Sequence, residues 1–207
     1  MVRNIVFLAI FLLSACGSKK NNTEKSEIVI LSESIQSDPT NTALLLDRAN
    51  YNKERNNLES ALFDLTQCVQ LDSLNSAFHL AVGEIYFELS KRPNANGRYP
   101  LLVKNHLTKA IQLNEKDEKS HALLGELMLA YAKYKEAIEH FNASLKIEYN
   151  QAKTHMLMGY AFKQLNQTDN AINCFRNAVN VDPEFKEAFV QLGQMFHMKG
   201  DTIAVVY

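Results

Sequence analysis

The chain has 207 residues, a formal net charge of −1 and 46% hydrophobic residues, with only 7 glycines and 4 prolines. This length suits one domain or a short repeat array, and the composition excludes collagen-like, low-complexity and largely disordered chains. The balanced charge lacks the basic character that nucleic-acid binding usually needs. Three cysteines without a CxxC spacing or a His/Cys cluster exclude a disulfide scaffold and a zinc finger. We therefore expect a helix-rich protein that does not bind nucleic acid.

The N-terminal segment 1–16, MVRNIVFLAIFLLSAC, has the layout of a secretory signal. Arg3 gives a positive start, and the apolar run at 5–13 is shorter than the roughly 20 residues that a membrane-spanning helix needs. Residues 13–16, LSAC, resemble the lipobox of bacterial lipoproteins. The resemblance implies a signal peptide at 1–15, lipidation of Cys16 and attachment to a lipid bilayer. The alternative is an ordinary signal peptide with an incidental cysteine.

Residues 16–25 are polar after the cysteine, and we expect them to form a flexible tether. An N-terminal helix is expected within 26–41. Gly17 stands where an Asp retains some lipoproteins in the inner membrane. By that resemblance, we expect a protein of the bacterial cell envelope that is anchored in the outer membrane and faces the periplasm.

Beyond residue 41 the sequence repeats. The positions of Gly125, Gly159 and Gly193 differ by 34 each time, and Gly83 precedes Gly125 by 42, which is 34 plus an insertion of 8. A bulky apolar residue comes 16 positions after the small one, at Leu65, Phe141 and Phe175. Two amphipathic helices of about 12–14 residues fit into such a unit with short turns. Because a single hairpin cannot bury its apolar face, we expect neighbouring units to stack into one continuous core.

This pattern resembles the tetratricopeptide repeat (TPR), a helix-turn-helix unit of about 34 residues, over nearly everything after residue 41. The resemblance implies an all-α fold, a right-handed α-solenoid. Its repeats are expected at 42–75, 76–117 with the insertion, 118–151, 152–185 and, in part, 186–207. Helices are expected near 26–37, 42–54, 58–71, 76–90, 100–113, 118–131, 134–147, 152–165, 168–181 and 186–199.

The first repeat departs from the pattern. Arg48 and Asn52 stand where a later repeat has Leu124 and Met128. We expect looser packing there, or a cap formed by the N-terminal helix. The last repeat is also atypical, because the sequence stops at Tyr207 within it; either its final helix is short or the sequence is a fragment.

Three histidines share one repeat position, His79, His121 and His155. Equivalent residues on stacked helices lie roughly 8–10 Å apart, whereas metal ligands must lie within about 2.0–2.2 Å of one ion. The shared position therefore favours half-buried structural rings. The sequence holds no HExxH, GxSxG or P-loop spacing, and Cys68 and Cys174 fall at core positions. We expect no catalytic residue, no metal and no cofactor.

The concave face of the expected solenoid is the candidate binding site. The family's contact positions correspond to Leu46, Leu80, Ala122, Met156 and Val190 in one row. A second row holds Asn50, Glu84, Glu126, Tyr160 and Gln194, and a third holds Lys53, Phe87, Leu129, Lys163 and His197. Apolar residues in the first row argue against the carboxylate clamp of the chaperone-binding branch. We expect the groove residues to be Leu46, Asn50, Leu80, Glu84, Phe87, Glu126, Leu129, Met156, Tyr160 and Lys163, with part of the row packing against neighbouring helices as the alternative.

These features together predict a lipid-anchored TPR adaptor that is not an enzyme and holds a protein or peptide partner of unknown identity in its groove. Two alternatives stay open. One is a cryptic enzyme or solute-binding lipoprotein, and the other is the TPR portion of a larger protein.

Overall fold

The computed structural model describes residues 19–200, with side chains from residue 27 onward. The predicted signal peptide, Cys16 and residues 201–207 lie outside the described residues. The described part is entirely helical, with no β-strand. Its helices are α1 (Lys19–Ser37), α2 (Thr42–Glu54), α3 (Leu58–Leu71), α4 (Ser76–Ser90), α5 (Tyr99–Leu113), α6 (Glu118–Ala130), α7 (Tyr134–Ile147), α8 (Ala152–Gln164), α9 (Thr168–Val181) and α10 (Lys186–Lys199).

Each end of helices α2 to α10 lies at the predicted residue or one residue away from it. The exception is α1, which begins at Lys19 instead of residue 26. Residues 19–25, expected to be a flexible tether, are therefore helical, because the run 19–37 contains no glycine or proline and includes Lys and Glu, which favour helices. None of the described helices is both long enough and apolar enough to cross a bilayer.

Helix starts and turns recur with the repeat. The side chains of Asn41, Asn75 and Asp117 each accept a hydrogen bond from a backbone N–H in the first turn of α2, α4 and α6. The tight turn between the two helices of a repeat contains one residue with a left-handed backbone, at Asn56, Ala132 and Asn166, and Gly200 after α10 occupies the same repeat position. The second repeat replaces this turn with the inserted loop.

Each repeat pairs a first helix with a second helix, and a close approach joins them. A Cβ added to Gly125 would lie 2.5 Å from Phe141 Cδ1, and one added to Gly159 would lie 2.7 Å from Phe175 Cε1. Both phenylalanines are fully buried. Glycine therefore lets the bulky residue of the second helix press directly on the first helix, as the repeat spacing predicts.

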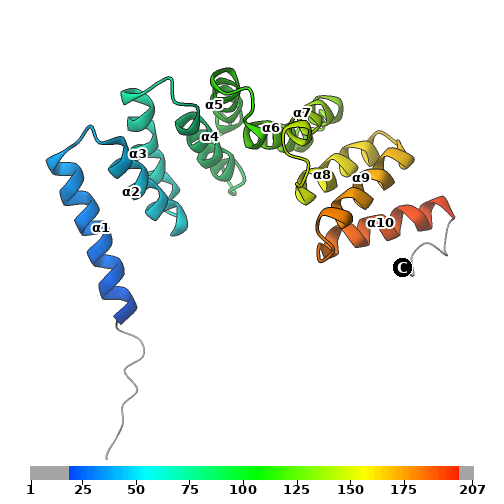
Figure 1. Ribbon diagram of the computed structural model, residues 1–207, viewed down its shortest axis with the longest axis horizontal. Coiled ribbons are helices and arrows are strands. Elements are labelled where there is room, and N and C mark those ends of the chain that lie inside the picture. The colour runs from blue at the N-terminus through cyan, green and yellow to red at the C-terminus, as the bar shows by residue number, and fades with distance from the viewer. Residues whose placement is uncertain (1–18, 201–207) are drawn as a thin grey trace, which may run out of the picture.

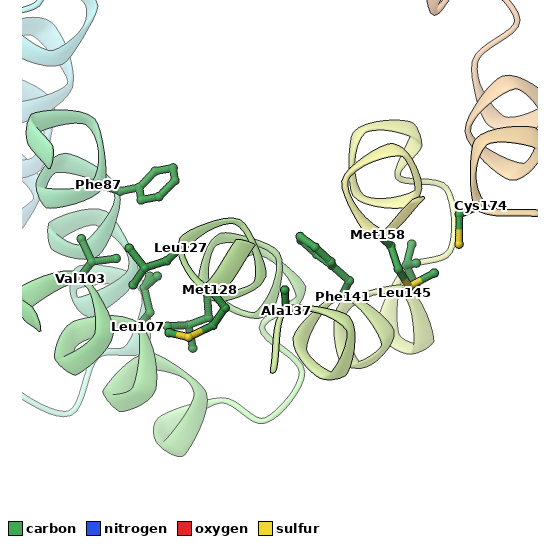
Figure 2. Packing of buried hydrophobic residues seen from close by; sticks show 11 residues of the cluster. Phe87, Val103, Leu107, Leu127, Met128, Ala137, Phe141, Leu145, Met158 and Cys174 are labelled. Atoms are coloured by element: carbon green, nitrogen blue, oxygen red, sulfur yellow. The ribbon is translucent and has the colours of Figure 1, made fainter. Parts of the chain in front are cut away.

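Successive pairs stack into an arch (Figure 1). The first helices α4, α6 and α8 touch one another, α4 with α6 and α6 with α8, in addition to touching their own second helices. This places the first helices on the inside of the curve. Figure 2 shows one buried cluster that runs along the array from Phe87 of α4 to Cys174 of α9. Cys68 and Cys174 are both buried and free, as expected.

The first repeat packs differently, as its sequence predicts. Arg48 of α2 donates from Nε and Nη2 to the Asp64 carboxylate of α3, at 2.9 and 2.7 Å. Arg48 Nη1 also lies 3.4 Å from Ser32 Oγ of α1. A hollow of about 490 Å³ adjoins this pair between α1, α2 and α3. Of the two alternatives, the cap is what the structure shows: α1 packs against α2, and the hollow remains beside the ion pair.

Candidate protein-binding groove

The apolar members of the predicted groove, which come from its first and third rows, lie on the first helices and differ in exposure. Met156 and Phe87 are 5% and 4% exposed and belong to the buried clusters, so they support the packing of their neighbours. Leu46, Leu80 and Leu129 are half-buried and pack against those clusters with part of their surface. The inner face therefore presents a narrow apolar strip, not a row of free side chains.

The charged members of the second row are paired within the chain. Lys53 donates to Glu84, and Lys153 donates to Glu126 at 2.8 Å. Lys91 Nζ lies 3.5 Å from the other Glu126 oxygen. Each of these pairs links successive repeats. These lysines offset the charge of the two carboxylates at the middle of the face.

Towards α10 the face is polar and hydrogen-bonded. Tyr160 Oη donates to Glu187 Oε1 at 3.1 Å, and Lys163 Nζ donates to Gln191 Oε1 at 3.1 Å. Burial and the Glu187 carboxylate raise the pKa of Tyr160 to about 12. Tyr160 is therefore a neutral hydrogen-bond donor at any physiological pH. Asn50, at the opposite end of the row, is exposed.

The histidines form pairs that the repeat positions of His79, His121 and His155 alone do not reveal. Nδ1 of His79 lies 3.2 Å from Nδ1 of His106, and Nδ1 of His121 lies 3.5 Å from Nδ1 of His140. The sequence does contain a sign of these pairs: His106 and His140, on the second helices, are also separated by one repeat length. Each pair joins the two helices of one repeat.

Burial lowers the pKa of His106, and the facing His79 lowers it further. Burial is also the larger cause that lowers the pKa of His140, and the facing His121 lowers that pKa further. Nε2 of His79 contacts the Ser73 carbonyl at 3.1 Å, which requires a proton on Nε2 and leaves its Nδ1 as the acceptor in the pair. Within residues 27–200 no three His, Cys, Asp or Glu side chains gather as metal ligands.

Sequence comparison finds the same repeat. Residues 159–200 match the family described as TPR repeat. The chain is 29% identical over 96 residues to the tetratricopeptide repeat-containing protein trd-1 of Caenorhabditis elegans, covering 46% of this chain and 12% of that protein. It is 29% identical over 83 residues to the CTR9 homologue of Arabidopsis thaliana, covering 40% of this chain and 8% of that protein. The chain thus spans only a small part of either relative.

Solved structures match over most of the chain. MamA superposes with a TM-score of 0.69 at 17% identity, covering 86% of this chain and 99% of that one. A tetratricopeptide repeat protein from Parabacteroides merdae gives 0.70 at 15% identity, covering 90% and 71%. YrrB, described as a TPR protein with an unusual peptide-binding site, gives 0.65 at 18% identity, covering 85% and 87%.

The fold is a TPR solenoid. The all-α solenoid expected from the repeat spacing is confirmed in residues 19–200. In a TPR solenoid each repeat contacts only its neighbours, which leaves a long inner face that no other part of the array covers.

Proposed function

We propose that this protein is a non-catalytic TPR adaptor that binds a protein or peptide segment along its inner face. The observation that carries the proposal is the strip of half-buried Leu46, Leu80 and Leu129, flanked by the paired residues Glu84 and Glu126. An extended or helical partner segment buries apolar side chains on such a strip. It completes its own hydrogen bonds at the polar flanks.

Two further points support the proposal. The solved TPR structure of YrrB, which shares this fold, is described as having a peptide-binding site. The carboxylates of the inner face are already paired with lysines, so a partner does not need to supply many positive charges. Shape and apolar contact then carry recognition, with Tyr160 and Asn50 as polar contacts.

We also propose that the protein is lipid-anchored through Cys16 in a bacterial cell envelope, in the outer membrane facing the periplasm. The support is the order of positive start, apolar run and LSAC in residues 1–16. Anchoring confines the inner face to a thin layer at the membrane. Even modest affinity then gives high occupancy by partners in that layer.

Site-specific photo-crosslinking in cells tests the inner face. A photoreactive amino acid replaces Glu84 or Val190 on first helices, and, as matched controls, Asn105 or Asn173, which are exposed on second helices. We expect one common adduct, of higher mass than the chain, from the two inner positions and none from the two outer positions. Adducts only from the outer positions, or from no position at all, would contradict the proposal.

A further inference from the structure

Helix α1 occupies the repeat position of a second helix. Leu31 precedes Leu65 by one full repeat, and Leu65 precedes Leu107 by one repeat with the insertion. The next members of the series are Phe141 and Phe175. A first helix that would pair with α1 does not occur within the described residues, where α1 is the first element.

The residues that correspond to Leu31 in later repeats are covered by a first helix, whereas Leu31 is not. Leu65, Leu107, Phe141 and Phe175 are at most 3% exposed, and each of the last three presses on a glycine of its own first helix. Leu31 is only half-buried, and its neighbour Ile30 is 59% exposed. An apolar surface that every later repeat covers with a first helix is therefore open on α1.

Helix α2 shows the same open place from the other side. Tyr51 corresponds to a series of residues that are at most 4% exposed in later repeats, Ile85, Leu127, Ala161 and Met195. Tyr51 is half-buried, and the Arg55 guanidinium lies over its ring at 3.5 Å. Between the two helices lies a hollow of about 420 Å³, lined by Glu27, Ile30, Leu31, Asp47, Asn50, Tyr51 and Glu54. It lies where a first helix would pair with α1.

The charge around the hollow indicates which helix fits. Glu27, Asp47 and Glu54 supply three carboxylates to the lining. Arg55, which stacks on Tyr51, lies 3.8 Å from Glu54 and offsets its charge, so Glu27 and Asp47 carry the excess negative charge. Elsewhere in the array, successive first helices are joined by Lys-to-Glu pairs such as Lys53–Glu84. A helix in this place therefore gains the same kind of contact if it carries lysine or arginine.

We propose that the hollow between α1 and α2 binds an amphipathic, basic helix of a partner protein, which takes the place of the missing first helix. The partner helix places glycine or alanine against Leu31, as Gly125 faces Phe141. Its basic residues reach Glu27 and Asp47. The proposal rests on the proposed protein-binding function and assigns it a second surface at the N-terminal end of the array.

A synthetic peptide with the sequence of α8, AKTHMLMGYAFKQ, is a suitable probe. It is a first helix of this array, it contains Gly159, Lys153 and Lys163, and it has no acidic residue. We expect saturable binding of the labelled peptide to the full chain by fluorescence anisotropy. Ile30→Lys should weaken binding at least about tenfold, because it places a charge in the apolar contact and repels the lysines. The matched control is Val29→Lys, which changes an exposed residue of the same helix outside the hollow.

Several results would overturn the proposal. The first is that the α8 peptide does not bind the unchanged chain. The second is that it binds the Ile30→Lys variant equally well. The third is that a peptide with Gly159→Leu, which lacks the small residue, binds the unchanged chain equally well. Dimerisation that Ile30→Lys abolishes would assign the surface to a second copy instead. Binding that appears only when residues 1–18 are removed would assign it to the chain's own N-terminus. Photo-crosslinks from Glu84 and Val190 report on the inner face separately, so failure of this proposal can be distinguished from failure of the proposed function.

Discussion

At the scale of single residues, an ion pair in the first repeat takes the place of an apolar contact. Arg48 occupies the position of Val82, Leu124 and Met158 in later repeats. Asp64 is 1% exposed, and its carboxylate accepts two hydrogen bonds from the Arg48 guanidinium. The Asp64 hydrogen bond raises the pKa of Arg48. A buried carboxylate is tolerated here because its charge and its lone pairs are both satisfied.

Replacing only Arg48 should therefore lower the free energy of unfolding more than replacing both Arg48 and Asp64. We expect Arg48→Met to lower the free energy of unfolding by roughly 3 kcal/mol, because it leaves the Asp64 carboxylate buried without a cation. Arg48→Met combined with Asp64→Leu should recover most of that loss, since the apolar pair leaves no buried charge without a partner. Urea unfolding followed by circular dichroism measures both. A double variant as unstable as the single one would show that the polar pair itself stabilises the repeat.

The paired histidines predict a dependence of stability on pH. Burial and the facing histidine hold the pKa of His106 and His140 below the ordinary 6.5. Below that pH the unfolded chain binds more protons than the folded chain, so the free energy of unfolding should fall as the pH falls below about 6.5. The double variant His106→Gln and His140→Gln should reduce the difference between unfolding at about pH 7.5 and about pH 5.5. An exposed change on α5, Thr108→Ala, is the control, and an unchanged difference in the double variant would refute the assignment.

At the scale of helices, the contact between glycine and a bulky residue sets the distance within each pair. Gly125 faces Phe141, and Gly159 faces Phe175, at separations that leave no room for a methyl group. The phenylalanine fills the space between the two helices and continues the buried cluster towards the next repeat (Figure 2). One small residue and one large residue thus determine both the pairing and part of the stacking.

Gly125→Ala should destabilise the protein by about 1–3 kcal/mol, because the new Cβ lies 2.5 Å from Phe141 and forces the helices apart. The matched control is Gly97→Ala in the inserted loop, where no atom lies within 4 Å of the added Cβ. The control should change the free energy of unfolding by less than about 0.5 kcal/mol. Equal effects of the two substitutions in thermal or urea unfolding would show that the close approach does not constrain the fold.

At the scale of the whole molecule, the arch is held together by contacts between neighbours. The cross-repeat pairs Lys53–Glu84 and Lys153–Glu126 lie on the inner face and add to the buried clusters. Exposed ion pairs contribute little to stability, on the order of 0–1 kcal/mol each. We therefore assign the curvature to apolar packing between repeats, with the ion pairs selecting the relative position of the first helices.

In our proposal, one residue, Cys16, attaches the whole molecule to the membrane. Cys16→Ser should move the protein from the membrane fraction to the soluble fraction after cell lysis, because each acyl CH₂ contributes about 0.8 kcal/mol to bilayer binding. Fractionation followed by immunoblotting measures the distribution. Cys68→Ser is the matched control, since Cys68 is buried in α3. Continued membrane association of the Cys16→Ser variant would contradict the anchor.

Much of the fold could be predicted because the repeat is a local pattern. The spacing of Gly125, Gly159 and Gly193 specifies the length of a hairpin, and the ends of α2 to α10 agree closely with the expected ones. Less of the candidate site was predictable. Phe87 and Met156 belong by position to the inner face, yet they are buried, because each is a member of a hydrophobic cluster that also includes residues of neighbouring helices.

The sequence by itself determined the helices, their order and the pairing within each repeat, because these depend on residues at most one repeat apart. Only the tertiary structure decided which charges are compensated and which surfaces are open. Glu84 and Glu126 meet lysines of neighbouring repeats, and the histidine pairs form across a hairpin. The open face of α1 is visible only against the covered faces of its counterparts, since burial depends on the neighbours that the fold supplies and not on the side chain alone.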